Sequence, residues 1–289
     1  MINKENNGEG LSTCIPVVQW AGGKRQLLSK IKERMPKEYE TYYEPFFGGG
    51  ALFFELLPEE AVINDFNPQL INVYNQIKTD YVPVLQLLDQ YQNQYNALGT
   101  KEAKAVYYYT LRKEFNKRIV AKELSFVSAA LFIFLNRTCF NALYRVNSKG
   151  EFNVPLGRKT HVNTYDLDNI QAVSKCLEKV KILNTDFELA CEGAKEGDFI
   201  FFDSPYYDTF DTYQAGGFSE ENHKRLAALY QKLTNKGVFC MLTNSDTDFI
   251  KGLYKRFKIE IIDVKRAINS DATKRTGKEI LVVNYDKGK

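Results

Sequence analysis

The chain has 289 residues, 44% of them apolar and 26% charged, which is enough apolar material for a core and excludes a disordered or fibrous chain. Its formal net charge of +3 does not identify a polyanion partner by itself, so nucleic-acid binding would require the basic residues to gather on one face. No apolar run approaches the length of a membrane span and the N-terminus MINKENNGEG is polar, so we expect a soluble cytoplasmic protein of bacterial or phage type.

The N-terminal part of the chain alternates between strand and helix patterns. After a short apolar stretch and a Gly-Gly turn, the spacing of Leu27, Leu28 and Ile31 predicts a helix. The stretch TYYEPFFGGGALFFELL predicts a strand, a glycine-rich turn and a helix, and AVINDFN predicts a short strand ending at Asn64 and Asp65. This succession favours a parallel sheet covered by helices.

The pattern changes in the middle of the chain and then returns. Residues 68–133 have helical spacing without strand alternation, and residues 136–160 are rich in turn formers and basic groups, as in an exposed loop or hairpin. Strands are predicted at VKILNTDF, GDFIFFDSPYY, GVFCMLTNS, IEIIDVKRA and EILVVNY, with helices at SEENHKRLAALYQKL and TDFIKGLYKRF. We therefore expect one α/β domain interrupted by a mostly helical insertion.

The cysteines and histidines offer little for a metal centre. The five cysteines lie far apart and form no CxxC pair, which is typical of reduced thiols in a cytosolic protein rather than of a disulfide framework or a zinc site. Only two histidines occur, His161 and His223, so we expect no metal.

The glycine-rich turn and the acid after the next strand point to a cofactor. Gly48 to Gly50 stand between a strand and a helix, where glycine lets the backbone approach a ligand; an ordinary tight turn is the alternative. The spacing is neither GxGxxG nor a Walker motif. Asp65 follows where an acid in this kind of sheet reaches ribose hydroxyls. Together these features indicate an adenosine-bearing cofactor without a pyrophosphate.

Two further acids stand at predicted strand ends. Asp186 lies in TDF and Asp203 in DSPYY, and ligands of open α/β sheets gather beyond the carboxyl ends of the strands. Each acid alone could simply cap a helix. All three acids at the same edge predict one binding site.

At this point the chain resembles a known family. QWAGGKR, EPFFGGGALFF, NDFN, the block NRTCFNALYRVNSKGEFNVPLGR, TDF and DSPYY occur in the order seen in the Dam-type (D12 class, alpha-group) DNA adenine-N6 methyltransferases. The resemblance covers residues 16–286, and the block in the insertion is its most specific part.

The resemblance implies a fold and a cofactor. The fold would be a Rossmann-like, S-adenosylmethionine-dependent methyltransferase sheet, with residues 1–67 and 161–289 as the catalytic domain and 68–160 as an inserted, mostly helical target-recognition domain. Asp65 would bind the cofactor ribose, and Asp186 would read its adenine with Phe187 packing beside it. The other implied cofactor-binding residues are Trp20, Lys24, Phe46, Gly48, Gly50 and Asp203.

The chemistry of such an enzyme depends on orientation more than on a strong base. The lone pair of an exocyclic adenine amine is delocalised into the ring, so catalysis requires in-line alignment and acceptors for the amino protons. The resemblance assigns these acceptors to the Asp203 carboxylate and the Ser204 carbonyl, which precede Pro205. Tyr206 would stack on the target base after it leaves the duplex.

Ser204 departs from the family pattern, which has a second proline at this position. A main-chain carbonyl does not depend on its side chain, and Pro205 already favours extended geometry in the residue before it. We therefore expect a retained catalytic step on a more flexible backbone, and expect Ser204→Pro to remain active.

The basic, aromatic block of the insertion would read DNA. Arg145 resembles a base-edge reader, because Arg is the usual bidentate partner of guanine. Phe140 and Asn141 resemble residues that enter the base stack, and Leu143 and Pro155 resemble contacts to a thymine methyl group. The remaining predicted DNA contacts are Arg137, Asn147, Lys274 and Arg275. Solvated basic loops are the alternative for these segments.

Similar enzymes with this block methylate adenine in GATC. They commonly carry Lys just before the tryptophan of WAGGK, where it contacts the outer guanine, and this chain has Gln19. Glutamine pairs more naturally with adenine than with guanine, so the sequence does not predict which base the enzyme requires at the first position of its recognition site.

The sequence therefore predicts an enzyme that methylates adenine N6 in double-stranded DNA, at GATC or a related site, in DNA methylation or restriction-modification. The alternatives are a cytosine-N4 methyltransferase, which uses the same acceptor geometry, and a catalytically weak, cofactor-binding DNA protein in which Ser204 marks decay. The hypothesis of a decayed enzyme is opposed by the presence of four expected site residues, Lys24, Asp65, Asp186 and Tyr206. We expect a monomer or a weak dimer on DNA, without metal or membrane association.

Overall fold

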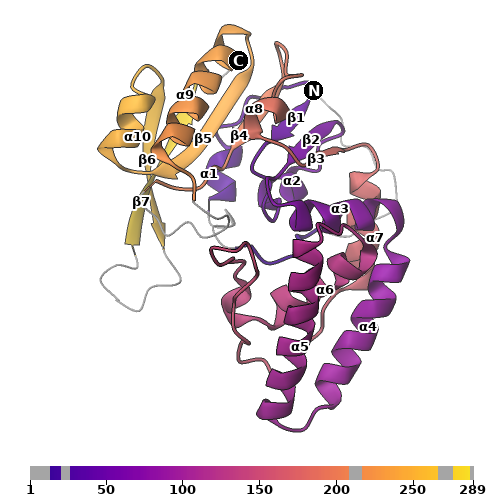
Figure 1. Ribbon diagram of the computed structural model, residues 1–289. Coiled ribbons are helices and arrows are strands. Elements are labelled where there is room, and N and C mark those ends of the chain that lie inside the picture. Colours follow the sequence, from indigo (N-terminus) through magenta and orange to yellow (C-terminus); the bar gives the residue numbers. More distant parts are fainter. Residues whose placement is uncertain (1–13, 21–26, 208–216, 266–275, 287–289) are drawn as a thin grey trace.

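The computed structural model describes residues 14–20, 27–207, 217–265 and 276–286. It has an α/β half, and a helical half that lies below it in the view of Figure 1. In the described residues no helix is both long and apolar enough to cross a membrane.

The described residues form one sheet of seven strands in the order β3-β2-β1-β4-β5-β7-β6. Strands β1 to β5 are parallel, whereas β7 runs antiparallel to both β5 and β6. The strands are β1 (Tyr42–Glu44), β2 (Ala61–Asn64), β3 (Lys181–Leu183), β4 (Phe199–Phe202), β5 (Phe239–Ser245), β6 (Lys258–Lys265) and β7 (Thr276–Val283). The carboxyl ends of β1 to β5 therefore meet at one edge of the sheet.

Both faces of the sheet are covered, which explains why its central strand is apolar throughout. All four residues of β4 are buried, with Phe199 and Phe201 in the core on one face and Ile200 and Phe202 in the core on the other. The helices of this half are α1 (Leu28–Lys32), α2 (Ala51–Leu56), α7 (Leu167–Leu177), α8 (Phe187–Ala190), α9 (Glu220–Asn235) and α10 (Asp248–Leu253).

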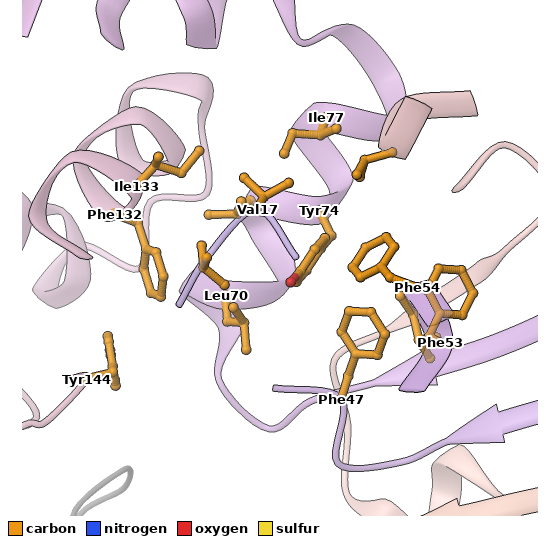
Figure 2. Close-up of a cluster of buried hydrophobic side chains, with 14 of the residues drawn as sticks. Val17, Phe47, Phe53, Phe54, Leu70, Tyr74, Ile77, Phe132, Ile133 and Tyr144 are labelled. Atoms are coloured by element: carbon orange, nitrogen blue, oxygen red, sulfur yellow. The ribbon is translucent and has the colours of Figure 1, made fainter. Parts of the chain in front are cut away.

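The helical half is built around α6 (Phe126–Thr138), which packs against α3 (Pro68–Asp80), α4 (Val82–Ala97) and α5 (Lys101–Val120). Helix α6 is buried on almost all sides, and its sequence is therefore a nearly continuous apolar run without an amphipathic pattern. Helix α3 also contacts β3 and α7. As Figure 2 shows, Phe47 beside the glycine turn, Tyr74 on α3 and Ile133 on α6 belong to one cluster of buried side chains. The two halves thus share a core.

The block after α6 folds back on itself as an irregular hairpin, residues 139–157, which we call the recognition hairpin. Antiparallel bridges join Cys139 to Leu156 and Val146 to Phe152, and a short 3₁₀ turn, η2 (Phe140–Ala142), lies at its start. The predicted hairpin is confirmed. It is not wholly exposed, because five of its residues are buried, namely Cys139, Ala142, Tyr144, Phe152 and Val154.

Some features were not expected from the sequence. Helix α7 was not predicted. Helix α8 was not predicted either, because it is a single turn directly after TDF. The five cysteines are free thiols, but Cys14 and Cys176 lie together, with 3.1 Å between their sulfur atoms. Among the described residues no group of His, Cys, Asp and Glu side chains is arranged to hold a metal ion.

Candidate active site

The three acids predicted from strand ends lie along the carboxyl edge of the sheet, after β2, β3 and β4. The loops after β2 and β3 are joined directly: the Asn64 side chain donates to the Thr185 carbonyl at 3.1 Å and accepts from its N–H at 2.9 Å. The Asn184 amide donates to the Asp65 carbonyl at 2.8 Å. These bonds hold Asp65 and Asp186 in neighbouring loops.

The glycine turn is bound to Asp65. The Gly48 N–H donates to Asp65 Oδ2, and the Asn67 N–H donates to Asp65 Oδ1, both at 2.9 Å. Burial raises the pKa of the Asp65 carboxyl, while these two backbone hydrogen bonds oppose the shift. Gly48 and Gly50 have φ angles of +49° and +67°, a region that favours glycine.

The indole of Trp20 lies against this turn. A Cβ atom on Gly48 would stand 2.7 Å from Trp20 Cδ1, so the turn requires glycine for space as well as for conformation. The same indole stacks on Tyr144 of the recognition hairpin, with ring centroids 5.7 Å apart, and Tyr144 stacks on Phe132 of α6. Trp20 thus connects the glycine turn with the recognition hairpin.

Asp186 is held at the start of α8. Its Oδ1 accepts from the Glu188 N–H at 3.0 Å and from Arg225 Nη2 at 2.9 Å, and Oδ2 has no partner among the described residues. The Arg225 guanidinium also lies 4.9 Å from the centre of the Phe187 ring. No pattern in the sequence pointed to Arg225, which comes from the distant helix α9.

An aromatic cluster includes Phe187, the residue directly after this acid. Phe46 lies 5.4 Å from Phe187 and 5.7 Å from Phe218, and Phe187 lies 5.9 Å from Phe218, measured between ring centroids. Phe218 was not predicted, because nothing in its local sequence distinguishes it from a core residue. The cluster offers apolar ring surface beside the Asp186 carboxylate, a combination suited to a purine.

Residues 203–207 follow β4 and are called the acceptor loop. The Thr243 hydroxyl donates to Asp203 Oδ1 at 2.8 Å, and the Tyr206 hydroxyl donates to Glu279 Oε2 at 2.8 Å. Ser204 is 1% exposed, and its hydroxyl accepts from the Asn244 amide at 3.2 Å. The expectation that Ser204 loosens this backbone stays a prediction, and the structure adds that its side chain is buried and hydrogen-bonded.

Glu44, at the end of β1, is a further acid that sequence reasoning missed. Its side chain is 3% exposed and accepts from the Tyr42 hydroxyl at 2.7 Å. Burial, with smaller contributions from the charges of Asp203 and Asp65, raises its pKa to about 8. The signal that could have found it is an acid between apolar residues of one strand, as in YYEPFF.

The recognition hairpin and Gln19 border a cavity of about 610 Å³, which is lined by Gln19, Cys139, Phe140, Asn141, Ala142, Arg158 and Lys159. The backbone of Gln19 is fixed by Asn136, whose side chain accepts from the Gln19 N–H at 2.9 Å and donates to its carbonyl at 2.8 Å. Phe140 is 40% exposed, and Asn141 has a φ of +53°. Gln19 and the start of the hairpin therefore border the same space.

The remaining residues predicted to contact DNA differ in their exposure and in their hydrogen bonds within the chain. Arg145 Nε donates to Asn153 Oδ1 at 2.7 Å, which orients the guanidinium. Leu143 is half-buried and Pro155 is exposed.

Arg137 and Asn147 have bonds within the chain. Arg137 Nη2 donates to the Val17 carbonyl at 2.7 Å, and the Asn147 side chain bonds Glu151 and builds the hairpin turn. These hydrogen bonds give Arg137 and Asn147 structural roles that do not require a contact with DNA. Lys24, Lys274 and Arg275 lie outside the described residues.

The fold and the site together define a class. A parallel sheet with an antiparallel β7, a glycine turn tied to the acid after β2, and an aromatic cluster beside the acid after β3 fit an adenosine-bearing cofactor. This is the arrangement of an S-adenosylmethionine-dependent methyltransferase.

Comparison with known proteins gives the family. Residues 20–268 match the D12 class N6 adenine-specific DNA methyltransferase family, and the chain belongs to this family. It is 42% identical to Type II methyltransferase M1.LlaDCHI of Lactococcus lactis subsp. cremoris, over 93% of this chain and 95% of the relative. It is 40% identical to Type II methyltransferase M.MjaIII of Methanocaldococcus jannaschii, over 93% and 99%. It is 30% identical to DNA adenine methylase of Escherichia coli K12, over 94% and 95%. The chain is thus an S-adenosylmethionine-dependent, adenine-specific DNA methyltransferase.

Proposed function

We propose that this enzyme methylates N6 of an adenine that has left the duplex, within GATC or a closely related sequence. The observation that carries the proposal is the position of the acceptor loop. It follows β4, next to β1 and its glycine turn, and Thr243 and Asn244 of β5 hold it from the other side. The acceptors for the target amine and the cofactor-binding residues then border one site.

In this proposal the cofactor spans the edge from β1 to β3. Asp65 bonds the ribose hydroxyls, and Oδ2 of Asp186, which no described residue contacts by a hydrogen bond, accepts from the adenine amino group of the cofactor. The aromatic cluster of Phe46, Phe187 and Phe218 encloses the ring, and the turn at Gly48 and Gly50 supports the methionine part together with Trp20, Lys24 and Asp203. Phe218 and Arg225 are additions that the sequence did not suggest.

S-adenosylmethionine, when bound, supplies a methyl group on a sulfonium, which is electrophilic enough that no strong base is needed. The Asp203 carboxylate and the Ser204 carbonyl accept hydrogen bonds from the two amino N–H groups of the target base and draw the nitrogen lone pair out of conjugation. The single proton that the nitrogen loses when it gains the methyl group passes to the Asp203 carboxylate and from there to solvent. Thr243 orients the carboxylate of Asp203, and Glu279 orients the phenol of Tyr206, on which the target base stacks. Pro205 keeps residue 204 extended.

Recognition of the site is assigned to the recognition hairpin and Gln19. Arg145 reads a guanine edge with the two terminal nitrogens that its bond to Asn153 leaves available. Phe140 and Asn141 enter the stack beside the vacated position, and Leu143 and Pro155 meet a thymine methyl group. Gln19 faces the base at the outer position, and Lys274 and Arg275 contact phosphates.

We place the target-recognition domain at residues 68–160 and the catalytic domain on either side of it. Helices α4 and α5 support this division, because they pack against α6 and against each other in the helical half of Figure 1. We further propose that the enzyme acts on double-stranded DNA as a monomer or a weak dimer. The Type II methyltransferases among its relatives suggest a partner restriction enzyme in the same cell.

A direct test begins with sequencing of genomic DNA from a methylation-deficient host that expresses the protein, with modified bases read at single-nucleotide resolution. We expect N6-methyladenine at one short motif that contains GATC or differs from it at the outer base pair. Methyl groups on cytosine N4 would refute the assignment to adenine.

The companion assay measures transfer of a radiolabelled methyl group to a GATC duplex. Asp203→Ala should abolish transfer while leaving a folded protein. Transfer by Asp203→Ala at the wild-type rate would refute the assignment of Asp203. A duplex set that varies the outer base pair tests Gln19, and Gln19→Lys should shift the preference toward guanine.

A further inference from the structure

The end of strand β5 binds the acceptor loop at several points. Thr243, Asn244 and Ser245 are its last three residues, and they are 1%, 1% and 6% exposed. Thr243 bonds the Asp203 carboxylate at 2.8 Å. Ser245 Oγ donates to the Tyr207 carbonyl at 2.8 Å. The loop is therefore held at both of its ends by consecutive residues of one strand.

Asn244 is the central residue of this arrangement. Its Nδ2 donates to Ser204 Oγ at 3.2 Å, and its Oδ1 accepts from the Tyr207 N–H at 3.1 Å and from the Ser245 N–H at 2.8 Å. One side chain thus bonds both a side chain near the start of the acceptor loop and the main chain at its end. A rotation of the Asn244 amide would break both sets of bonds at once.

Among the described residues, the Ser204 hydroxyl is the one acceptor of the Asn244 Nδ2 group. Ser204 and Asn244 are each 1% exposed, so solvent does not replace the partner if one of them is removed. A buried donor without an acceptor is costly, whereas the paired donor is stable. The family pattern has proline where this chain has Ser204, and the side chain of a proline offers no acceptor to the Asn244 amide. The departure at position 204 therefore supplies the group that Asn244 requires.

We propose that Asn244 is a positioning residue for methyl transfer, and that Ser204 is its partner in this chain. The pair fixes the main chain at residue 204, so that its carbonyl stays aligned with the Asp203 carboxylate. This inference rests on the proposed roles of Asp203 and of the Ser204 carbonyl. It also sharpens the expectation that Ser204→Pro remains active: the substitution removes the side-chain acceptor of a buried amide and should slow the enzyme without abolishing transfer.

The experiment compares the wild type with Asn244→Ala, Ser204→Ala, Ser204→Pro and the double variant Ser204→Ala/Asn244→Ala. The substrate is unmethylated genomic DNA, which presents many sequence contexts and so does not presuppose GATC. Single-turnover methyl transfer is measured at saturating S-adenosylmethionine, together with the Kd of the cofactor and the urea midpoint of unfolding. Rates are taken only where each variant is fully folded.

We expect Asn244→Ala to lower the single-turnover rate on the order of tenfold, and Ser204→Ala and Ser204→Pro to lower it by about threefold to tenfold. The double variant should be no slower than Asn244→Ala within about twofold, because both substitutions remove the same bond. The cofactor Kd should change less than the rate. Strictly multiplicative effects of the two substitutions would overturn the pairing.

Asn284 is the matched control. Its side chain accepts from the Cys240 N–H and donates to the Val238 carbonyl and the Thr234 hydroxyl, all at 2.8 Å, near the opposite end of β5. Asn284→Ala should lower the urea midpoint and leave the single-turnover rate unchanged. If Asn244→Ala behaves in the same way, Asn244 has only a structural role and the proposal fails.

Asp203→Ala separates this proposal from the proposed function. An inactive Asp203→Ala beside a fully active Asn244→Ala would refute the positioning role alone. A fully active Asp203→Ala would refute the catalytic assignment of the acceptor loop, and the role of Asn244 with it.

Discussion

Replacing Glu44 by glutamine should stabilise the protein at neutral and alkaline pH and flatten the dependence of its stability on pH. The Glu44 carboxyl is buried beneath the site, 3% exposed, and its pKa is raised from 4.5 to about 8. Between these values the native state holds a proton that the unfolded state has lost. The free energy of unfolding therefore falls as pH rises from about 4.5 to about 8, and the loss is complete above that window.

The magnitude follows from the size of the shift. One pKa unit corresponds to about 1.4 kcal/mol, so the loss is on the order of 3 kcal/mol at neutral pH and somewhat more above pH 8. This is a large part of the roughly 5–15 kcal/mol that stabilise a typical domain. The Tyr42 hydroxyl, which donates to the carboxylate at 2.7 Å, opposes the shift, so Tyr42→Phe should raise the pKa of Glu44 further.

Urea unfolding of the wild type and Glu44→Gln, over a range from about pH 5 to about pH 9, measures the difference in unfolding free energy. Taking the difference cancels the titration of the other groups. Glu55→Gln is the control, because it removes an exposed carboxylate that pairs with Lys32, and it should change stability by less than about 1 kcal/mol. A constant difference between Glu44→Gln and the wild type across this range would refute the reasoning.

Two further predictions concern the glycine turn and the recognition hairpin. Gly48→Ala places a Cβ atom 2.7 Å from Trp20 at a φ of +49°, and we expect it to weaken cofactor binding, measured by calorimetry, at least about tenfold. Gly150→Ala is the control, because its φ is also positive, at +77°, but the space around it is open. It should lower the free energy of unfolding by about 1–2 kcal/mol and leave cofactor affinity unchanged. Equal cofactor affinities for the two variants would show that the Trp20 indole moves aside freely. Arg145→Lys keeps the charge but loses the hydrogen bond to Asn153 and the planar guanidinium. Discrimination of guanine from other bases should therefore fall by about 1–3 kcal/mol, measured by methylation of duplexes with one altered base pair. Asn153→Ala should reproduce part of this loss. Uniformly weaker methylation of all duplexes would instead assign Arg145 to a phosphate.

Much of this architecture could be predicted from the sequence, because it depends on local patterns. Apolar runs ending in polar residues predicted the strands β2, β4 and β5, and the carboxyl ends of parallel strands share an edge whatever the order of the strands. That rule is sufficient to bring Asp65, Asp186 and Asp203 to one side of the sheet. The motifs of the recognition hairpin predicted the family, and the match over residues 20–268 confirms it.

Which side chains meet at the site was decided by the tertiary structure. Arg225 reaches Asp186 across 39 positions of sequence, and Asn244 reaches Ser204 across 40. Arg137 is basic like Arg145, yet it binds the Val17 carbonyl, because α6 directs it toward the N-terminal segment. Composition and spacing do not distinguish such cases.

The serine of DSPYY shows this division most clearly. The sequence by itself determined that an acid and an aromatic side chain follow a buried strand, and that a serine replaces the expected proline. Only the register of β4 against β5, in which Phe202 pairs with Leu242, brings Asn244 to the Ser204 hydroxyl. Since register depends on the packing of both strands in the core, the partner of Ser204 is a property of the folded sheet and not of the motif.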